Sequence, residues 1–132
     1  MSLTNDERRA IVTYRIEKAD VAVEDVEQLS LLQRWSIAAN RLYYAVYYAA
    51  TALLIDRGYV SHTHSGMITQ VNLHFVRQGI LSREDGRLIR KLFELRQEAD
   101  YDDFIDADEA DINEYLPQVK ILIDKIKSLI SD

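Results

Sequence analysis

The 132-residue sequence contains no cysteine, a single proline and only four glycines. Without cysteine the chain has neither a disulfide framework nor thiolate chemistry. The scarcity of helix-breaking residues is typical of a helical protein and argues against a β-sandwich or a disordered chain. No segment alternates convincingly between apolar and polar residues, so no strand is predicted. The sequence therefore predicts an all-α fold.

Long apolar runs and a basic surface are also lacking. The uncharged, mostly apolar stretch from Leu42 to Ile55 has fourteen residues, whereas a membrane-spanning helix needs about 20. The first ten residues, MSLTNDERRA, carry charges and no apolar signal core, so we expect a cytoplasmic protein with no export signal and no membrane association. The net charge of −6 argues against broad nonspecific binding to nucleic acid but leaves room for a small local basic site.

The apolar periodicity predicts one domain over residues 1–132, built as a four- to five-helix up-and-down bundle. The expected helices cover about residues 5–29, 32–56, 64–78, 83–100 and 107–130. We expect N-caps at Thr4 with Glu7, at Ser61 or Thr63, at Ser82, and at Asp106 with Glu109. Gly58 and Gly79 are expected to end the second and third helices.

The helix around residues 40–55 is apolar almost all round, which predicts that it is the central helix of the bundle. On a helical wheel its core arc contains Trp35, Leu42, Val46, Ala49 and Leu53. The opposite arc contains Asn40, Arg41, Tyr44, Tyr48 and Thr51. Polar groups that become buried need hydrogen-bond partners, so the second arc is the first candidate for a functional surface.

A second signal lies in the fourth helix, where Arg96 and Asp100 fall on the apolar arc while the other charges share a solvated face. The two residues are four apart and can contact each other. One interpretation is a structural ion pair tied to Asn40, Tyr44 or Tyr48. The other is an anion or nucleotide site in which Arg96 presents its guanidinium to a phosphate group.

No cofactor motif and no metal site are predicted. The spacing of His62, His64 and His74 does not close a metal site, and His64 instead has the position of a buried, hydrogen-bonding histidine. Seven acidic residues lie between residues 100 and 111, but they lack the order of a calcium-binding loop. Helix capping explains them better.

Three segments in this order resemble the HEPN domain family, and within it the small stand-alone bacterial and archaeal proteins. They are Arg41–Ala50 (RLYYAVYYAA), Thr63–Gly66 (THSG) and Phe93–Tyr101 (FELRQEADY). The resemblance extends from about Trp35 to Asp103, more than half of the chain.

The resemblance implies a helical bundle, often a homodimer, with a groove for a nucleotide or RNA. Many family members are encoded beside a small nucleotidyltransferase as a toxin–antitoxin or related pair. Catalytic members are metal-independent ribonucleases that use an arginine followed four to six residues later by a histidine. Arg96 fits the arginine, but Asp100, Tyr101 and Asp102 occupy the histidine positions. The histidine common in the second-helix segment is replaced by Tyr48.

Three functions remain open at this point. The first is a nucleotide- or RNA-binding module that acts with a nucleotidyltransferase partner. The second is a ribonuclease toxin with a modified active site, so whether the protein is an enzyme is left open. The third is a non-catalytic interaction scaffold with a structural Arg–Asp pair. The residues predicted to form the groove are Asn40, Arg41, Tyr44, Tyr48, His64, Arg96, Asp100 and Tyr101.

Overall fold

The computed structural model describes residues 3–101 and 106–130, with the backbone alone for Tyr101. Every regular element in these ranges is a helix, which confirms the all-α prediction. The elements are α1 (Asn5–Leu31), α2 (Trp35–Asp56), α3 (His64–Val71), the π-helix η1 (Asn72–Val76), α4 (Arg83–Tyr101) and α5 (Glu109–Leu129).

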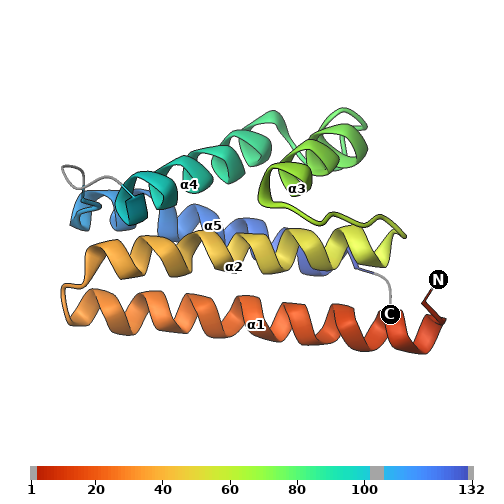
Figure 1. Ribbon diagram of the computed structural model, residues 1–132, viewed down its shortest axis with the longest axis horizontal. Helices are drawn as coiled ribbons and strands as arrows, with labels where there is room; N and C mark the ends of the chain where they lie inside the picture. The colour runs from red at the N-terminus through yellow and green to blue at the C-terminus, as the bar shows by residue number, and fades with distance from the viewer. Residues whose placement is uncertain (1–2, 102–105, 131–132) are drawn as a thin grey trace.

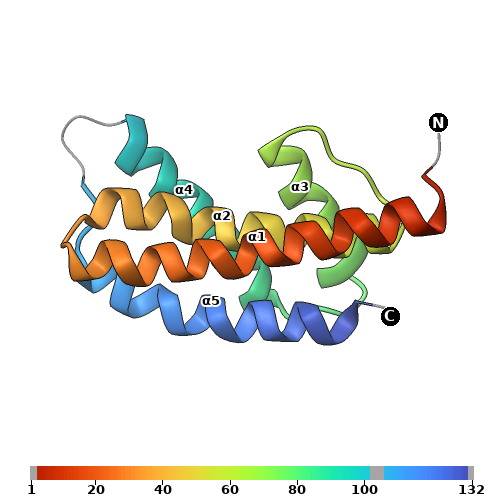
Figure 2. The same ribbon diagram turned by 90° about the horizontal axis from the view of Figure 1, so that it is seen from below.

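The helices are arranged around α2, which contacts all four of the other α-helices. The long helices α1, α2, α4 and α5 run alternately in opposite directions (Figure 1). Helices α3 and α4 lie on the side of α2 away from α1 and are inclined to it (Figure 1). Helix α5 runs beside α1 and α2 (Figure 2). Because α2 is covered on several sides, its sequence is apolar almost all round.

The predicted core arc of α2 is confirmed for Leu42, Val46, Ala49 and Leu53, which are all buried, whereas Trp35 at the start of the helix is only partly buried. Alanines at several other core positions of α2, including Ala38 and Ala45, are also buried. Small side chains allow the neighbouring helices to approach α2 closely while the larger ones fill the space between them. This packing holds the helices that carry the candidate site in fixed positions.

Most of the predicted helix ends are confirmed. Thr4 and Glu7 form a capping box, and Ser82 forms the same pair of bonds with Asp85 at the start of α4. Of the two candidates for the cap of α3, Thr63 is the one whose hydroxyl accepts the backbone N–H of Gly66, at 2.9 Å. Gly58 and Gly79 have φ values of 85° and 76°, a conformation that is costly for other residues.

Two predicted boundaries near the first turn are wrong. Helix α1 continues to Leu31, and α2 begins at Trp35 rather than near residue 32. The reason is Gln33, whose φ of 57° turns the chain, so that the N–H of Arg34 bonds back to the carbonyl of Leu29 at 2.9 Å.

The third and fifth helices also differ from their predicted form. The regular part of α3 ends at Val71, and the chain continues as the π-helix η1, which periodicity alone does not reveal. Helix α5 is capped by Asp108 with Asp111 rather than by Asp106 with Glu109. Each carboxylate of this pair accepts the backbone N–H of the other residue at 3.0 Å. The acidic residues before α5 fit the capping pattern at two positions, two residues apart, and the sequence alone did not distinguish them.

Candidate functional site

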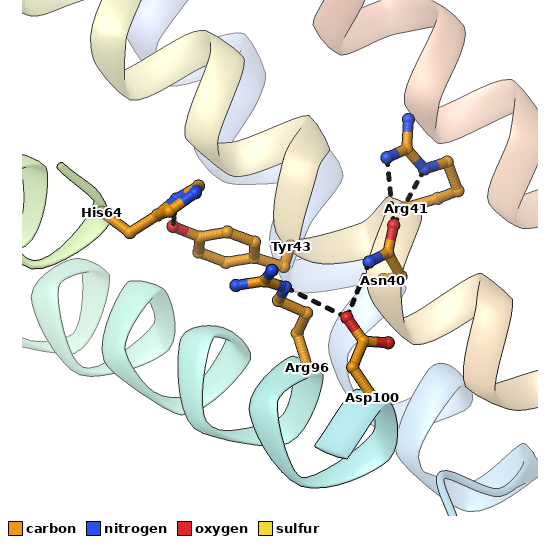
Figure 3. Close-up of polar contacts among 6 residues, drawn as sticks. All are labelled: Asn40, Arg41, Tyr43, His64, Arg96 and Asp100. Carbon is orange, nitrogen blue, oxygen red and sulfur yellow. Dashed lines mark hydrogen bonds and ion pairs between the residues drawn. The ribbon is translucent and has the colours of Figure 1, made fainter. Parts of the chain in front are cut away.

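The charged pair predicted in the fourth helix joins α4 to α2. Arg96 is only 9% exposed, and its Nε lies 3.2 Å from Oδ2 of Asp100. The same carboxylate oxygen accepts a bond from Nδ2 of Asn40 at 3.0 Å. The side-chain oxygen of Asn40 accepts two bonds from Arg41, at 3.2 and 3.0 Å (Figure 3). We call these four residues the polar seam.

Tyrosine rings support the two guanidinium groups of the polar seam. The Cζ atom of Arg96 lies 5.6 Å from the ring centroids of both Tyr43 and Tyr44, and that of Arg41 lies 4.8 Å from the ring centroid of Tyr44. At these distances the electron-rich ring faces attract the cations. Arg96 is therefore held by an ion pair on one side and by aromatic rings on the other.

The rings continue toward α3 and reach a histidine. Tyr43 is fully buried, and its hydroxyl lies 2.8 Å from Nδ1 of His64 (Figure 3). The Tyr47 and His64 rings lie 4.7 Å apart between centroids. We call Tyr43, Tyr44, Tyr47 and His64 the aromatic cluster. It brings an imidazole from the start of α3 to the same region as Arg96 on α4.

The environment of the aromatic cluster fixes two protonation states. Burial, and then the positive charge of Arg96, lower the pKa of His64 below its ordinary value. Burial raises the pKa of Tyr43 far above its ordinary range. At neutral pH the imidazole is therefore neutral and the phenol keeps its proton. The donor of the hydrogen bond between Tyr43 and His64 then depends on which ring nitrogen of the neutral imidazole carries its proton.

Most of the predicted groove residues come together. Asn40, Arg41, Arg96 and Asp100 form the polar seam, Tyr44 contacts both arginines, and His64 joins through Tyr43. The predicted tie between the ion pair and Asn40 is confirmed. Tyr48 is set back from the seam and packs against the rings of Tyr44 and Tyr47 at 5.9 and 5.8 Å. The side chain of Tyr101 lies outside the described residues.

Two members of the aromatic cluster, Tyr43 and Tyr47, were not among the residues predicted to form the groove. Tyr43 and Tyr47 lie one turn apart on the flank of α2, beside the predicted polar arc. The requirement that a buried tyrosine hydroxyl find a partner is the signal that could have identified Tyr43. The partner itself, His64, lies 21 residues away in the sequence and could not be paired with Tyr43 without the fold.

The other histidines and the acidic residues do not form a metal centre in the part of the chain that the structure describes. No group of three or more histidine, aspartate or glutamate side chains there is arranged to hold a metal ion. His74 instead stacks on Tyr59 with 3.6 Å between the ring centroids, in agreement with the structural role expected for it. No helix within the described ranges is both long enough and apolar enough to cross a membrane.

Comparison with known proteins gives a consistent result. A UPF0332 protein of Thermotoga maritima is 30% identical over 127 residues, which cover 96% of each chain. Two proteins of Methanocaldococcus jannaschii, each named a putative toxin, are 28% identical over 99% of this chain and 97% of the relative, and 30% identical over 85% and 76%.

A family model matches a range of residues that includes both the helical bundle and the candidate site. The model of the HEPN domain matches residues 12–129, a range that contains the whole polar seam and the whole aromatic cluster. The match extends well beyond the three segments that carry the resemblance in the sequence. The chain therefore belongs to the HEPN domain family.

Proposed function

We propose that this HEPN protein is a nucleotide- or RNA-binding module that works with a nucleotidyltransferase partner as a toxin–antitoxin-like pair. The observation that supports binding is the setting of Arg96, a nearly buried guanidinium held between a carboxylate and two tyrosine rings. The names of the two M. jannaschii relatives support a toxin-like role, and a toxin of this kind needs a partner that restrains it.

The side chains at the site suit the parts of a nucleotide. Aromatic faces stack with nucleobases of any sequence, and Tyr44, Tyr47 and Tyr48 are each partly exposed. The neutral imidazole of His64 can accept or donate a hydrogen bond to a ribose hydroxyl. A guanidinium can bind phosphate through two parallel bonds. These groups gather from α2, α3 and α4 within one surface region.

Asp100 limits how Arg96 can meet a phosphate. Its carboxylate already accepts a bond from Arg96, and its side chain is 27% exposed compared with 11% for Arg96. An incoming phosphate therefore meets the negative charge first and must displace it or bind beside it. We expect Asp100→Asn to increase the affinity for phosphorylated ligands, because it removes this repulsion and retains an amide oxygen for Arg96.

The test of binding is a thermal-shift screen with mononucleotides and short RNA, since a ligand that binds the native state raises its stability. The informative variant is Arg96→Met, and the matched control is Arg90→Met, which removes an exposed charge from the same helix. We expect the ligand-dependent shift to fall in the Arg96 variant and to persist in the control. A folded Arg96→Met protein with unchanged nucleotide affinity would contradict the proposal.

The partnership has a separate test. The nucleotidyltransferase is expected to be encoded beside this gene and to co-purify with the protein when the two are expressed together. Growth arrest on expression of this protein alone, relieved by co-expression of the neighbouring gene, would support the pair. Absence of a nucleotidyltransferase gene from the neighbourhood, together with normal growth, would count against it.

One observation favours a second function, a metal-independent ribonuclease. The α4 segment lacks the histidine of catalytic family members, but α3 supplies His64 to the same cluster in the neutral form that a general base requires. In the tautomer whose Nδ1–H donates to the Tyr43 oxygen, Nε2 of His64 would take the proton of a ribose 2′-hydroxyl as the 2′-oxygen attacks the adjacent phosphorus. The bond from phosphorus to the 5′-oxygen would break, and the departing oxygen would take a proton from water. Cleavage of RNA in EDTA that is lost in His64→Gln would support this function. No cleavage by the wild-type protein would exclude it.

A further inference from the structure

A cavity of about 270 Å³ lies between α1, α2 and the segment that leads into α3. Its walls come from both helices and from residues 59–62. The lining residues are Leu3, Arg15, Tyr47, Thr51, Leu54, Ile55, Tyr59, Val60, Ser61 and His62. We call it the Arg15 cavity. Tyr47 belongs to this cavity and also to the aromatic cluster, so the two regions share a wall.

Arg15 is the only guanidinium among the lining residues that the structure describes, and none of those residues carries a carboxylate. Its Nη1 donates to Oγ1 of Thr51 at 3.0 Å. Thr51 is 4% exposed, and its hydroxyl bonds back to the carbonyl of Tyr47 at 2.9 Å. No ion pair of Arg15 occurs within the described ranges. Within these ranges Arg15 therefore uses one of its five N–H donors, and no carboxylate shares its charge.

Arg15 and Arg96 differ in whether a carboxylate lies beside the guanidinium, where it would repel a phosphate. Arg96 shares its charge with Asp100 at 3.2 Å, whereas among the described residues the side chain that bonds to Arg15 is the neutral hydroxyl of Thr51. An anion that approaches Arg15 displaces no carboxylate. Of these two partly or nearly buried guanidiniums beside α2, Arg15 is therefore the better prepared for a phosphate group.

The remaining walls suit the rest of a nucleotide. Tyr47 and Tyr59 present aromatic rings to the cavity, and Tyr59 is held in place by its stack on His74. Leu54 and Ile55 line the cavity with apolar side chains, and Ser61 adds a hydroxyl. Its volume is close to the lower end of the range of small-molecule sites, so the cavity fits one nucleotide and not a folded RNA.

We propose that the Arg15 cavity binds one phosphorylated nucleotide, with the phosphate on Arg15 and the base against the tyrosine rings. This inference rests on the proposed nucleotide-binding function and adds a second location to it, on the far side of Tyr47 from Arg96. The nucleotide is either free or the 5′-terminal residue of an RNA strand that continues over Tyr47 toward the polar seam. Both sources present the same chemistry to Arg15.

Calorimetric titration of the full chain with AMP, with adenosine and with a ribotrinucleotide carrying or lacking a 5′-phosphate tests the inference. Loss of a charge-assisted hydrogen bond corresponds to a roughly 10- to 100-fold loss of affinity. We expect a loss of this size for AMP in Arg15→Met, and no change for adenosine. Lys18→Met, which removes an exposed charge one turn along α1, serves as the control and should bind AMP as the wild type does.

Arg15→Lys keeps the charge and gives a second variant in case Arg15→Met unfolds; it should retain most of the AMP affinity. A stronger effect of the 5′-phosphate on the trinucleotide than on the mononucleotide identifies the RNA end as the ligand, and the reverse identifies the free nucleotide. If Arg96→Met abolishes nucleotide binding while Arg15→Met leaves it unchanged, the Arg15 inference is overturned and the proposed function stands. If the wild-type protein binds none of the four ligands, both are overturned.

Discussion

The hydrogen bond between Tyr43 and His64 provides the sharpest test of the aromatic cluster. Tyr43→Phe removes only the hydroxyl and keeps the buried ring that packs against Phe93, with 5.7 Å between the centroids. It therefore isolates the 2.8 Å bond to Nδ1 of His64 from the packing of the ring.

The expected cost follows from the surroundings of the two partners. A hydrogen bond contributes on the order of 1 kcal/mol net, and a partner left buried without a bond adds to the cost. His64 is only partly buried, so the second contribution is smaller than it would be in a closed core. We expect Tyr43→Phe to lower the free energy of unfolding by about 1 kcal/mol. With a urea m-value of about 1.5 kcal/mol/M, the midpoint falls by roughly 0.7 M.

Urea unfolding followed by circular dichroism at pH 7.5 measures this change. Tyr14→Phe is the matched control, because Tyr14 is 58% exposed and loses a hydroxyl that water already solvates. A double-mutant cycle with His64→Ala should give a coupling of about 1 kcal/mol. Additive effects of the two substitutions, or a Tyr43→Phe protein as stable as the wild type, would refute the assigned bond.

Three further predictions concern separate features. The pKa of His64 is lowered in the folded state, so its contribution to stability is complete above the ordinary pKa of about 6.5 and declines as the pH falls toward the folded-state value. Unfolding midpoints measured between pH 7.5 and 5 should show this decline, and His64→Gln should make the decline smaller. Gly58→Ala should cost about 1 kcal/mol in thermal unfolding, because φ is 85° there although nothing obstructs a Cβ. Asp100→Asn should tighten the binding of AMP but not of adenosine in calorimetry, and equal changes for both ligands would contradict the repulsion argument.

The sequence predicted the fold to the extent that each signal was local. The core arc of α2 followed from a 3.6-residue period, and the capping box at Thr4 followed from residues three apart. The N-cap at Ser82 was predicted too, but not its second bond with Asp85. The ion pair of Arg96 and Asp100 followed from a four-residue spacing on an apolar arc. Local signals failed where two solutions were equally good, as at Asp106 and Asp108, or where the departure lay in the backbone, as at Gln33 and in η1.

The candidate site was predicted only in part because its contacts join distant segments. The seam residues on α2 and α4 could be identified separately, since each is polar on an apolar face. The bonds from Tyr43 to His64 and from Arg15 to Thr51 span 21 and 36 residues. Nothing in the spacing of those residues indicates that they meet, because the angles between helices and the path of residues 57–63 decide it.

The structure also refines the question of whether the surface beside α2 is closed on itself or open to a ligand. At the Asn40 end the surface is largely closed, because Asp100 already accepts hydrogen bonds from both Arg96 and Asn40. A ligand there would compete with Asp100 for these donors. At the Thr51 end the surface is open, because Arg15 faces a cavity without a carboxylate in the described residues. The tyrosines connect the two ends. A ligand that enters by the Arg15 cavity can therefore gain binding energy before it has to compete with Asp100, which favours the open end as the point of first contact.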